Sequence, residues 1–103
     1  MSYALFGNFT VEAKDKETLA SILQQAAEIL QTNDDCMQYL VSDSGSETEV
    51  WVWEVWTDKQ AHDDSLKNEE LLALIMDAKP MITGMAPQTE LTILGGKGLT
   101  STD

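Results

Sequence analysis

Several features that mark common protein classes are missing from this 103-residue chain. Cys36 is its one cysteine, which excludes an internal disulfide and a cluster of thiolate metal ligands. Six basic residues stand against eighteen acidic ones, and the formal charge of −12 argues against nucleic-acid partners and anionic membrane surfaces. There is no apolar run of transmembrane length and no signal-segment pattern at the start. We therefore expect a cytoplasmic protein that binds neither nucleic acid nor membrane.

Residues 49–56, Glu-Val-Trp-Val-Trp-Glu-Val-Trp, predict a strand that is apolar on both sides. Six of the eight positions are β-branched or aromatic, and none is glycine or proline. Alternation places two sets on opposite faces: Val50, Val52, Glu54 and Trp56 on one, and Trp51, Trp53 and Val55 on the other. A sheet with one face in water would carry polar residues at alternate positions, so we expect both faces of this strand to be covered.

The hydrophobic pattern of the whole chain predicts one domain over residues 1–103. Strands are predicted over 3–11, 36–42, 49–56 and 88–94, and helices over 15–32, 57–68 and 69–79. Asp15 is expected to cap the first helix, and Thr57 with Gln60 is expected to form a capping box at the second. Residues 95–103 are expected to be a flexible, glycine-rich tail.

The predicted order β, α, β, β, α, β is that of a ferredoxin-like α+β domain, βαββαβ, with helices on one face of a four-stranded antiparallel sheet. The opposite face would be bare in a monomer, although half of the apolar residues of 49–56 would lie there. Two such sheets packed face to face would cover each other. We therefore predict a homodimer whose core is a shared barrel, a dimeric α+β barrel.

The pattern Glu54-x-Trp56, followed by Asp-Lys-Gln-Ala-His at 58–62, resembles the antibiotic biosynthesis monooxygenase (ABM)-like family of dimeric α+β barrels. The resemblance covers roughly residues 3–99 and includes the order of elements. That family contains quinol and polyketide-phenol monooxygenases that use O2 without metal or flavin, relatives that degrade haem, and members of unknown activity. The resemblance implies an enzyme that needs no cofactor and oxidises a quinol or polycyclic phenol, so the expected partner is a small aromatic substrate.

The resemblance also picks out individual positions. Asn8 matches the spacing of a pocket asparagine in haem-degrading and some phenol-oxidising relatives, and Trp56 matches a tryptophan that closes many of these pockets. Many members carry a histidine about eight to ten residues after that tryptophan, but here Ser65 stands in that interval and His62 comes earlier. This departure weakens a haem role. His62 and Ser65 are neighbours on the helix surface, so His62 is expected to reach the same cavity from one turn back.

A cofactor-free oxygenase must remove a proton from its substrate, stabilise the resulting anion and exclude water. His62 is the candidate general base because its ordinary pKa lies near neutrality, and Asp58 is a candidate to orient it. The remaining candidates are Asn8 as the catalytic oxyanion donor, Trp56 as a stacking surface, and Ser65 and Glu54 as further substrate-binding residues.

Each candidate also has a structural interpretation. His62, next to Asp63 and Asp64, is typical of a solvated helix surface, and this run lacks the spacing of a metal-binding helix, so no metal site is expected. Trp56 fits a core position equally well. Glu54 on an apolar face needs a partner, for which we expect a lysine or backbone amides.

The alternative function is a non-catalytic protein of the same fold that binds a small ligand or serves as an interaction subunit. An isomerase or lactone-forming role on this scaffold also stays open. A cavity that contains Asn8, His62 and Trp56 favours the enzyme, whereas a filled core between sheet and helices favours the alternative.

Overall fold

The computed structural model describes residues 1–85 and 87–99. Two short 3-10 turns, η1 and η2, accompany the main helices and strands. In chain order the elements are β1 (Ser2–Val11), η1 (Ala13–Asp15), α1 (Lys16–Leu30), β2 (Cys36–Ser42), β3 (Glu49–Trp56), α2 (Lys59–Ser65), α3 (Glu69–Ala78), η2 (Lys79–Met81), β4 (Ile82–Met85) and β5 (Thr89–Ile93). Of the predicted tail over 95–103, residues 100–103 lie outside the described part.

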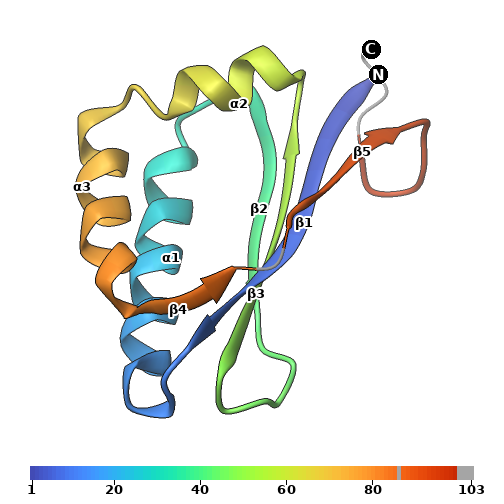
Figure 1. The fold of residues 1–103 in the computed structure, drawn as a ribbon. Coiled ribbons are helices and arrows are strands. Elements are labelled where there is room, and N and C mark those ends of the chain that lie inside the picture. The colour runs from blue at the N-terminus through green and yellow to red at the C-terminus, as the bar shows by residue number, and fades with distance from the viewer. Residues whose placement is uncertain (86, 100–103) are drawn as a thin grey trace.

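The strands form one antiparallel sheet in the order β2-β3-β1-β4, with β5 also paired to β1 (Figure 1). β4 pairs with the last residues of β1 and β5 with its first residues, so the two short strands follow one another along the same edge. The ferredoxin-like α+β fold is therefore confirmed, but the expected four-stranded sheet has five strands. β4 was not predicted, because Ile-Thr-Gly-Met is short and contains a glycine.

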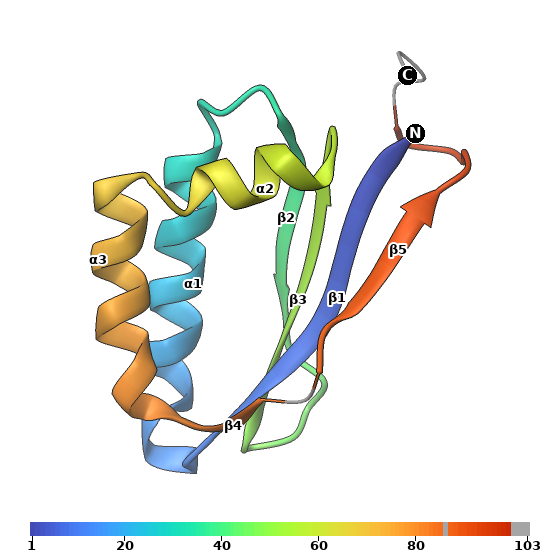
Figure 2. The same cartoon turned by 45° about the horizontal axis from the view of Figure 1, so that its top comes forward.

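The helices form a second layer on one face of the sheet, and α2 crosses the end at which β3 finishes (Figure 2). α1 packs five buried residues against the sheet and α3, and these are Leu19, Ile22, Leu23, Ala26 and Leu30. None of the helices in residues 1–85 and 87–99 is both long and apolar enough to span a membrane.

The start of α2 differs from the prediction. Asp58 is its N-cap, and its Oδ1 accepts a hydrogen bond of 2.8 Å from the backbone N–H of Ala61. Thr57 instead donates its backbone N–H to the carbonyl of Asp35, which holds it against the turn that precedes β2. The predicted capping box from Thr57 to Gln60 is therefore wrong. Asp15 occupies the N-cap position of α1 as expected, but without a side-chain hydrogen bond.

No described helix covers the other side of the sheet, which we call the open face (Figure 2). Its large apolar side chains that are partly exposed are Phe6, Leu40, Trp51, Trp53 and Leu91. The ring centroid of Phe6 lies 5.2 Å from that of Trp51 and 5.9 Å from that of Trp53. The homodimer stays a prediction, and the open face is the surface through which it would form.

Candidate functional site

A cavity of about 330 Å³ lies between the helix-facing side of the sheet and the helices. This volume is within the range of about 300–1,000 Å³ that is typical of small-ligand sites. Most of the lining is aliphatic or aromatic. The polar side chains in it are Tyr39, Glu54, His62, Ser65, Lys79 and Gln88.

Glu54 is a buried carboxylate on the helix-facing side of β3, with only 8% of the residue exposed. Its Oε1 accepts a 3.1 Å hydrogen bond from the indole Nε1–H of Trp56, two residues along the same strand face. Burial raises the pKa of this carboxyl, while the Trp56 hydrogen bond and the nearby His62 oppose the shift. The partner of Glu54 is thus an indole, and the expected lysine or backbone amide is wrong.

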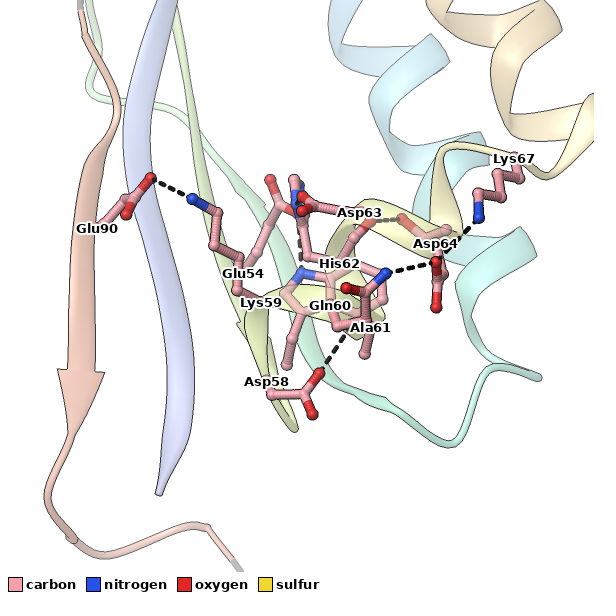
Figure 3. Close-up of polar contacts among 12 residues, drawn as sticks. Glu54, Asp58, Lys59, Gln60, Ala61, His62, Asp63, Asp64, Lys67 and Glu90 are labelled. Carbon is pink, nitrogen blue, oxygen red and sulfur yellow. Dashed lines mark hydrogen bonds and ion pairs between the residues drawn. The ribbon is translucent and has the colours of Figure 1, made fainter.

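His62 is carried by α2 over the end of β3, as Figure 3 shows. Its side chain is 20% exposed, and its ring packs edge-on against Trp56 with centroids 5.5 Å apart. The Nε2 atom lies 3.9 Å from Oε1 of Glu54, and Nδ1 lies 3.1 Å from Oδ1 of Asp63. His62 is therefore not a solvated surface residue. Asp58 caps α2, and the carboxylates that face the imidazole belong to Glu54 and Asp63.

Trp56 and Ser65 both line the cavity. Trp56 is 1% exposed and belongs to the core cluster with Leu30 and Leu71, so it is a core residue and a cavity wall at once. Ser65 is buried, and its Oγ donates a 2.6 Å hydrogen bond to the carbonyl of His62. This bond uses the hydroxyl hydrogen within the helix and leaves the oxygen as an acceptor.

Asn8 is not among the residues that line the cavity. In the register of β1 and β3 it lies opposite Trp51 of the open face, and its Nδ2 donates a 3.3 Å hydrogen bond to Oε2 of Glu49. Its neighbours Gly7 and Phe9 point to the helix-facing side instead. The structure therefore brings Glu54, Trp56, His62 and Ser65 together at one cavity, and Asn8, the candidate oxyanion donor, lies outside it.

Three polar residues of the cavity lining were not predicted from the sequence, and they are Tyr39, Lys79 and Gln88. Tyr39 of β2 lies opposite Glu54 in the sheet register, and burial, with smaller effects from the charges of Glu54 and Cys36, raises the pKa of its phenol well above the usual value. Alternation along residues 36–42 could have placed Tyr39 on the helix-facing side of the sheet, next to Glu54. Lys79 and Gln88 lie on either side of β4, and no local pattern indicates that they reach a cavity.

Potential metal ligands are not clustered in the described residues. Among residues 1–85 and 87–99, no three His, Cys, Asp or Glu side chains form a group that could hold a metal ion. Cys36 is a free thiol whose pKa burial and the charge of Glu54 raise to about 11. The thiol therefore stays protonated near neutral pH and is a poor nucleophile.

The chain is similar to a known family and to several solved structures. A family model described as antibiotic biosynthesis monooxygenase matches residues 2–75. A candidate antibiotic biosynthesis monooxygenase from Chloroflexus aurantiacus is 25% identical with a TM-score of 0.86, and the alignment covers 97% of this chain and 100% of that one. A Mycobacterium tuberculosis protein is 18% identical over 94% and 99%, with a TM-score of 0.81. SnoaB from Streptomyces nogalater, described as a cofactor-independent oxygenase, is 15% identical over 95% and 98%, with a TM-score of 0.75. No curated protein sequence matched the chain.

Proposed function

Because the chain belongs to the antibiotic biosynthesis monooxygenase family, we propose that it is a cofactor-independent monooxygenase that oxidises a quinol or polycyclic phenol with O2. The observation that supports this most strongly is the Glu54 and His62 pair at the wall of an apolar cavity of about 330 Å³. Such a site can bind a flat aromatic molecule, accept a proton from it and exclude water. An apolar wall also keeps the reactive carbanion or phenolate away from bulk solvent.

His62 is the general base in this proposal. With Nδ1–H donated to the Asp63 carboxylate 3.1 Å away, the lone pair of Nε2 is free to accept the phenol proton. Nε2 is 3.9 Å from Glu54, which is too far for a direct hydrogen bond and leaves the lone pair available. Once Nε2 is protonated, the imidazolium faces the Glu54 carboxylate, which stabilises the positive charge.

Tyr39 takes the role of hydrogen-bond donor to the substrate oxyanion. It lines the cavity opposite Glu54, and its hydroxyl makes no hydrogen bond to any residue in the described part of the chain. Its raised pKa keeps the hydroxyl protonated, so it can donate to the anion that forms when the phenol loses its proton. The ring of Trp56 offers a surface for the flat substrate.

The substrate itself supplies all the electrons. One C–H bond is broken and one C–O bond is formed, the second oxygen atom leaves as water, and no external reductant is needed. A hydroquinone is converted in this way to a hydroxyquinone and one water for each O2 consumed. Water as the second product separates this reaction from autoxidation, in which O2 is reduced to hydrogen peroxide.

Oxygen uptake on a panel of menadiol-type quinols tests the proposal. His62→Gln should lower kcat by about 100-fold or more, because general-base catalysis contributes on the order of 10² to 10⁴. Asp64→Asn is the matched control on the same helix, since Asp64 is exposed and bonded to Gln60 and Lys67. Catalase releases O2 from hydrogen peroxide, so its addition to the oxygen-electrode chamber should release no O2 if water is the product.

Two results would contradict the proposal. Wild-type turnover in His62→Gln would remove the general-base role. Quinol binding in a titration without catalysed O2 uptake would favour the non-catalytic ligand-binding alternative.

A further inference from the structure

Glu54 presents an unpaired hydrogen-bond acceptor to the cavity. Oε1 accepts from the indole of Trp56, whereas Oε2 has no hydrogen-bond partner in the described part of the chain. Among the described residues, Nε1 of Trp51 is the one side-chain nitrogen or oxygen that is fully buried and has no partner. Oε2 therefore still contacts open space, and the cavity that Glu54 lines supplies it. Because a carboxylate in apolar surroundings needs donors, a bound ligand is the available source of one.

The imidazole of His62 places a second acceptor beside the first. Nδ1 lies 3.1 Å from Oδ1 of Asp63, whose side chain is 51% exposed, so this edge of the ring faces the surface. Nε2 is on the opposite edge, 3.9 Å from Oε1 of the buried Glu54, and His62 thus stands between the two acids (Figure 3). With Nδ1–H donated to Asp63, Nε2 is an acceptor, and no donor of the described residues bonds to it.

Two acceptors at this separation suit two hydroxyls on neighbouring carbons of one aromatic ring. Such a pair leaves the same edge of the ring, so one O–H can reach Nε2 of His62 and the other Glu54 at the usual distance of about 2.7–3.0 Å. Hydroxyls on opposite sides of a ring point away from each other, and only one of them can reach these acceptors. A single hydroxyl also leaves one acceptor without a donor, which costs binding free energy in an apolar cavity.

Resting on the oxygenase function above, we propose that the substrate is a catechol, an arene with two adjacent hydroxyls, with one hydroxyl at Nε2 of His62 and the other at the carboxylate of Glu54. Glu54 is then the residue that selects between diphenol isomers. In the reaction a catechol and O2 give a hydroxy-ortho-quinone and water. One C–H bond, both O–H bonds and the O–O bond break, one new C–O bond forms, and the catechol supplies all the electrons that O2 accepts.

Two isomers of one molecule test this selection. The probes are 2,3-dihydroxynaphthalene, whose hydroxyls are adjacent, and 2,7-dihydroxynaphthalene, whose hydroxyls lie on different rings. Their dissociation constants are measured by isothermal titration calorimetry in anaerobic buffer at pH 7, where both probes are neutral and neither is oxidised. The wild type should bind the 2,3-isomer about tenfold or more tightly than the 2,7-isomer, because the adjacent hydroxyl adds one hydrogen bond to a charged group.

Glu54→Gln removes the second acceptor and keeps an oxygen that accepts from Trp56. We expect it to weaken binding of the 2,3-isomer about 10- to 100-fold and that of the 2,7-isomer less than about twofold. Glu49→Gln is the matched control on β3, because Glu49 bonds to Asn8 and Ser44 outside the cavity, and it should change neither affinity. Equal affinity of the wild type for the two isomers, no binding of either isomer, or equal losses for both isomers in Glu54→Gln would overturn the proposal.

The titration separates this inference from the oxygenase function, because it measures binding without turnover. If the 2,3-isomer is preferred through Glu54 and no quinol or catechol supports O2 uptake, recognition of adjacent hydroxyls stands and the oxygenase function fails. If menadiol-type quinols are oxidised and the wild type binds the two isomers equally, the oxygenase function stands and the selection of catechols fails.

Discussion

The two faces of β3 are alike in sequence and differ in what covers them. On the helix-facing side Val50, Val52 and Trp56 are buried, and the indole N–H of Trp56 is bonded to Glu54. On the open face Trp51 and Trp53 are partly exposed, although Val55 of the same face is buried. The buried Nε1 of Trp51 has no hydrogen-bond partner among the described residues. Because buried polar groups are normally satisfied, one face is complete within a single chain and the other is incomplete.

This difference assigns separate roles to the two faces. The helix-facing side has a cavity with acidic, basic and hydroxyl groups, and so it has the means for chemistry. The open face has apolar side chains and no cavity-lining polar group, and so it has the composition of an interface. The predicted homodimer would use the second face without blocking the first.

The largest contrast is expected from removing a tryptophan on each face. Trp56→Ala should lower the free energy of unfolding by about 3–5 kcal/mol, because it opens a void in a packed core. Trp53→Ala should lower it by about 1 kcal/mol, since that ring is partly exposed and is held by a hydrogen bond to Gln38 and an edge contact with Phe6. Urea denaturation of both variants, at protein concentrations where the chain is monomeric, measures the difference. Equal losses would mean that the two faces are equally buried in the single chain.

The next contrast concerns association. Leu40 on the open face is 52% exposed, and Leu72 on α3 is 41% exposed, so they are matched targets on the two sides of the molecule. Leu40→Glu should raise the dimer dissociation constant about 100-fold or more, because a charge would be buried without a partner at the interface. Leu72→Glu should leave it unchanged. Analytical ultracentrifugation of both variants decides the matter, and a monomeric wild type would remove the homodimer altogether.

A smaller contrast compares the two candidate donors to the substrate oxyanion. Tyr39 lines the cavity, whereas Asn8 lies opposite Trp51 and is bonded to Glu49. Tyr39→Phe should lower kcat on quinols about 10- to 100-fold by removing one hydrogen bond to the developing anion. Asn8→Ala should retain wild-type turnover if the reaction takes place in the cavity. The reverse pattern in steady-state O2 uptake would move the chemistry to the open face and restore the role predicted for Asn8.

Most of the fold could be predicted from sequence because its signals are local. Residues 36–42 and 49–56 have the bounds of β2 and β3, since neither segment contains glycine or proline and the turn residues at 33–35 and 43–48 separate them from their neighbours. β4 has four residues and was missed, because it is held as a strand by pairing with residues 9–11 of β1. That pairing joins segments about seventy residues apart and has no counterpart in the local pattern.

The site was predicted only where neighbours along the chain share a face. Glu54 and Trp56 are two residues apart on one strand, and His62 and Ser65 are one helical turn apart, so each pair could be placed together. Side chains alternate along β1, so Asn8 lies on the side of the sheet opposite Phe9 and outside the cavity. Lys79 and Gln88 reach the cavity through the path of the chain around β4, and this depends on long-range packing.

The smallest expected effect comes from Glu54, the buried acid of the helix-facing side. Burial raises the pKa of its carboxyl, so the folded chain holds this proton more tightly than the unfolded chain does. The contribution of Glu54 to the free energy of unfolding therefore falls as pH rises from the ordinary pKa of a glutamate to the raised pKa of the folded state. Glu54→Gln removes this decrease and keeps an oxygen that accepts from Trp56.

We expect Glu54→Gln to be more stable than the wild type by about 1 kcal/mol at pH 8, or about 4–8 °C in Tm, and to differ little at pH 4. The comparison is made in a His62→Gln background, because His62 lies 3.9 Å from Glu54 and its own charge would otherwise contribute to the difference. Glu49→Gln is the control on the same strand, since Glu49 bonds to Asn8 and Ser44 outside the cavity. A stability difference that is the same at both pH values would show that Glu54 is ionised as readily in the folded chain as in the unfolded one. In that case Glu54 would be fully ionised near neutral pH, and its carboxylate would be available to stabilise the His62 imidazolium.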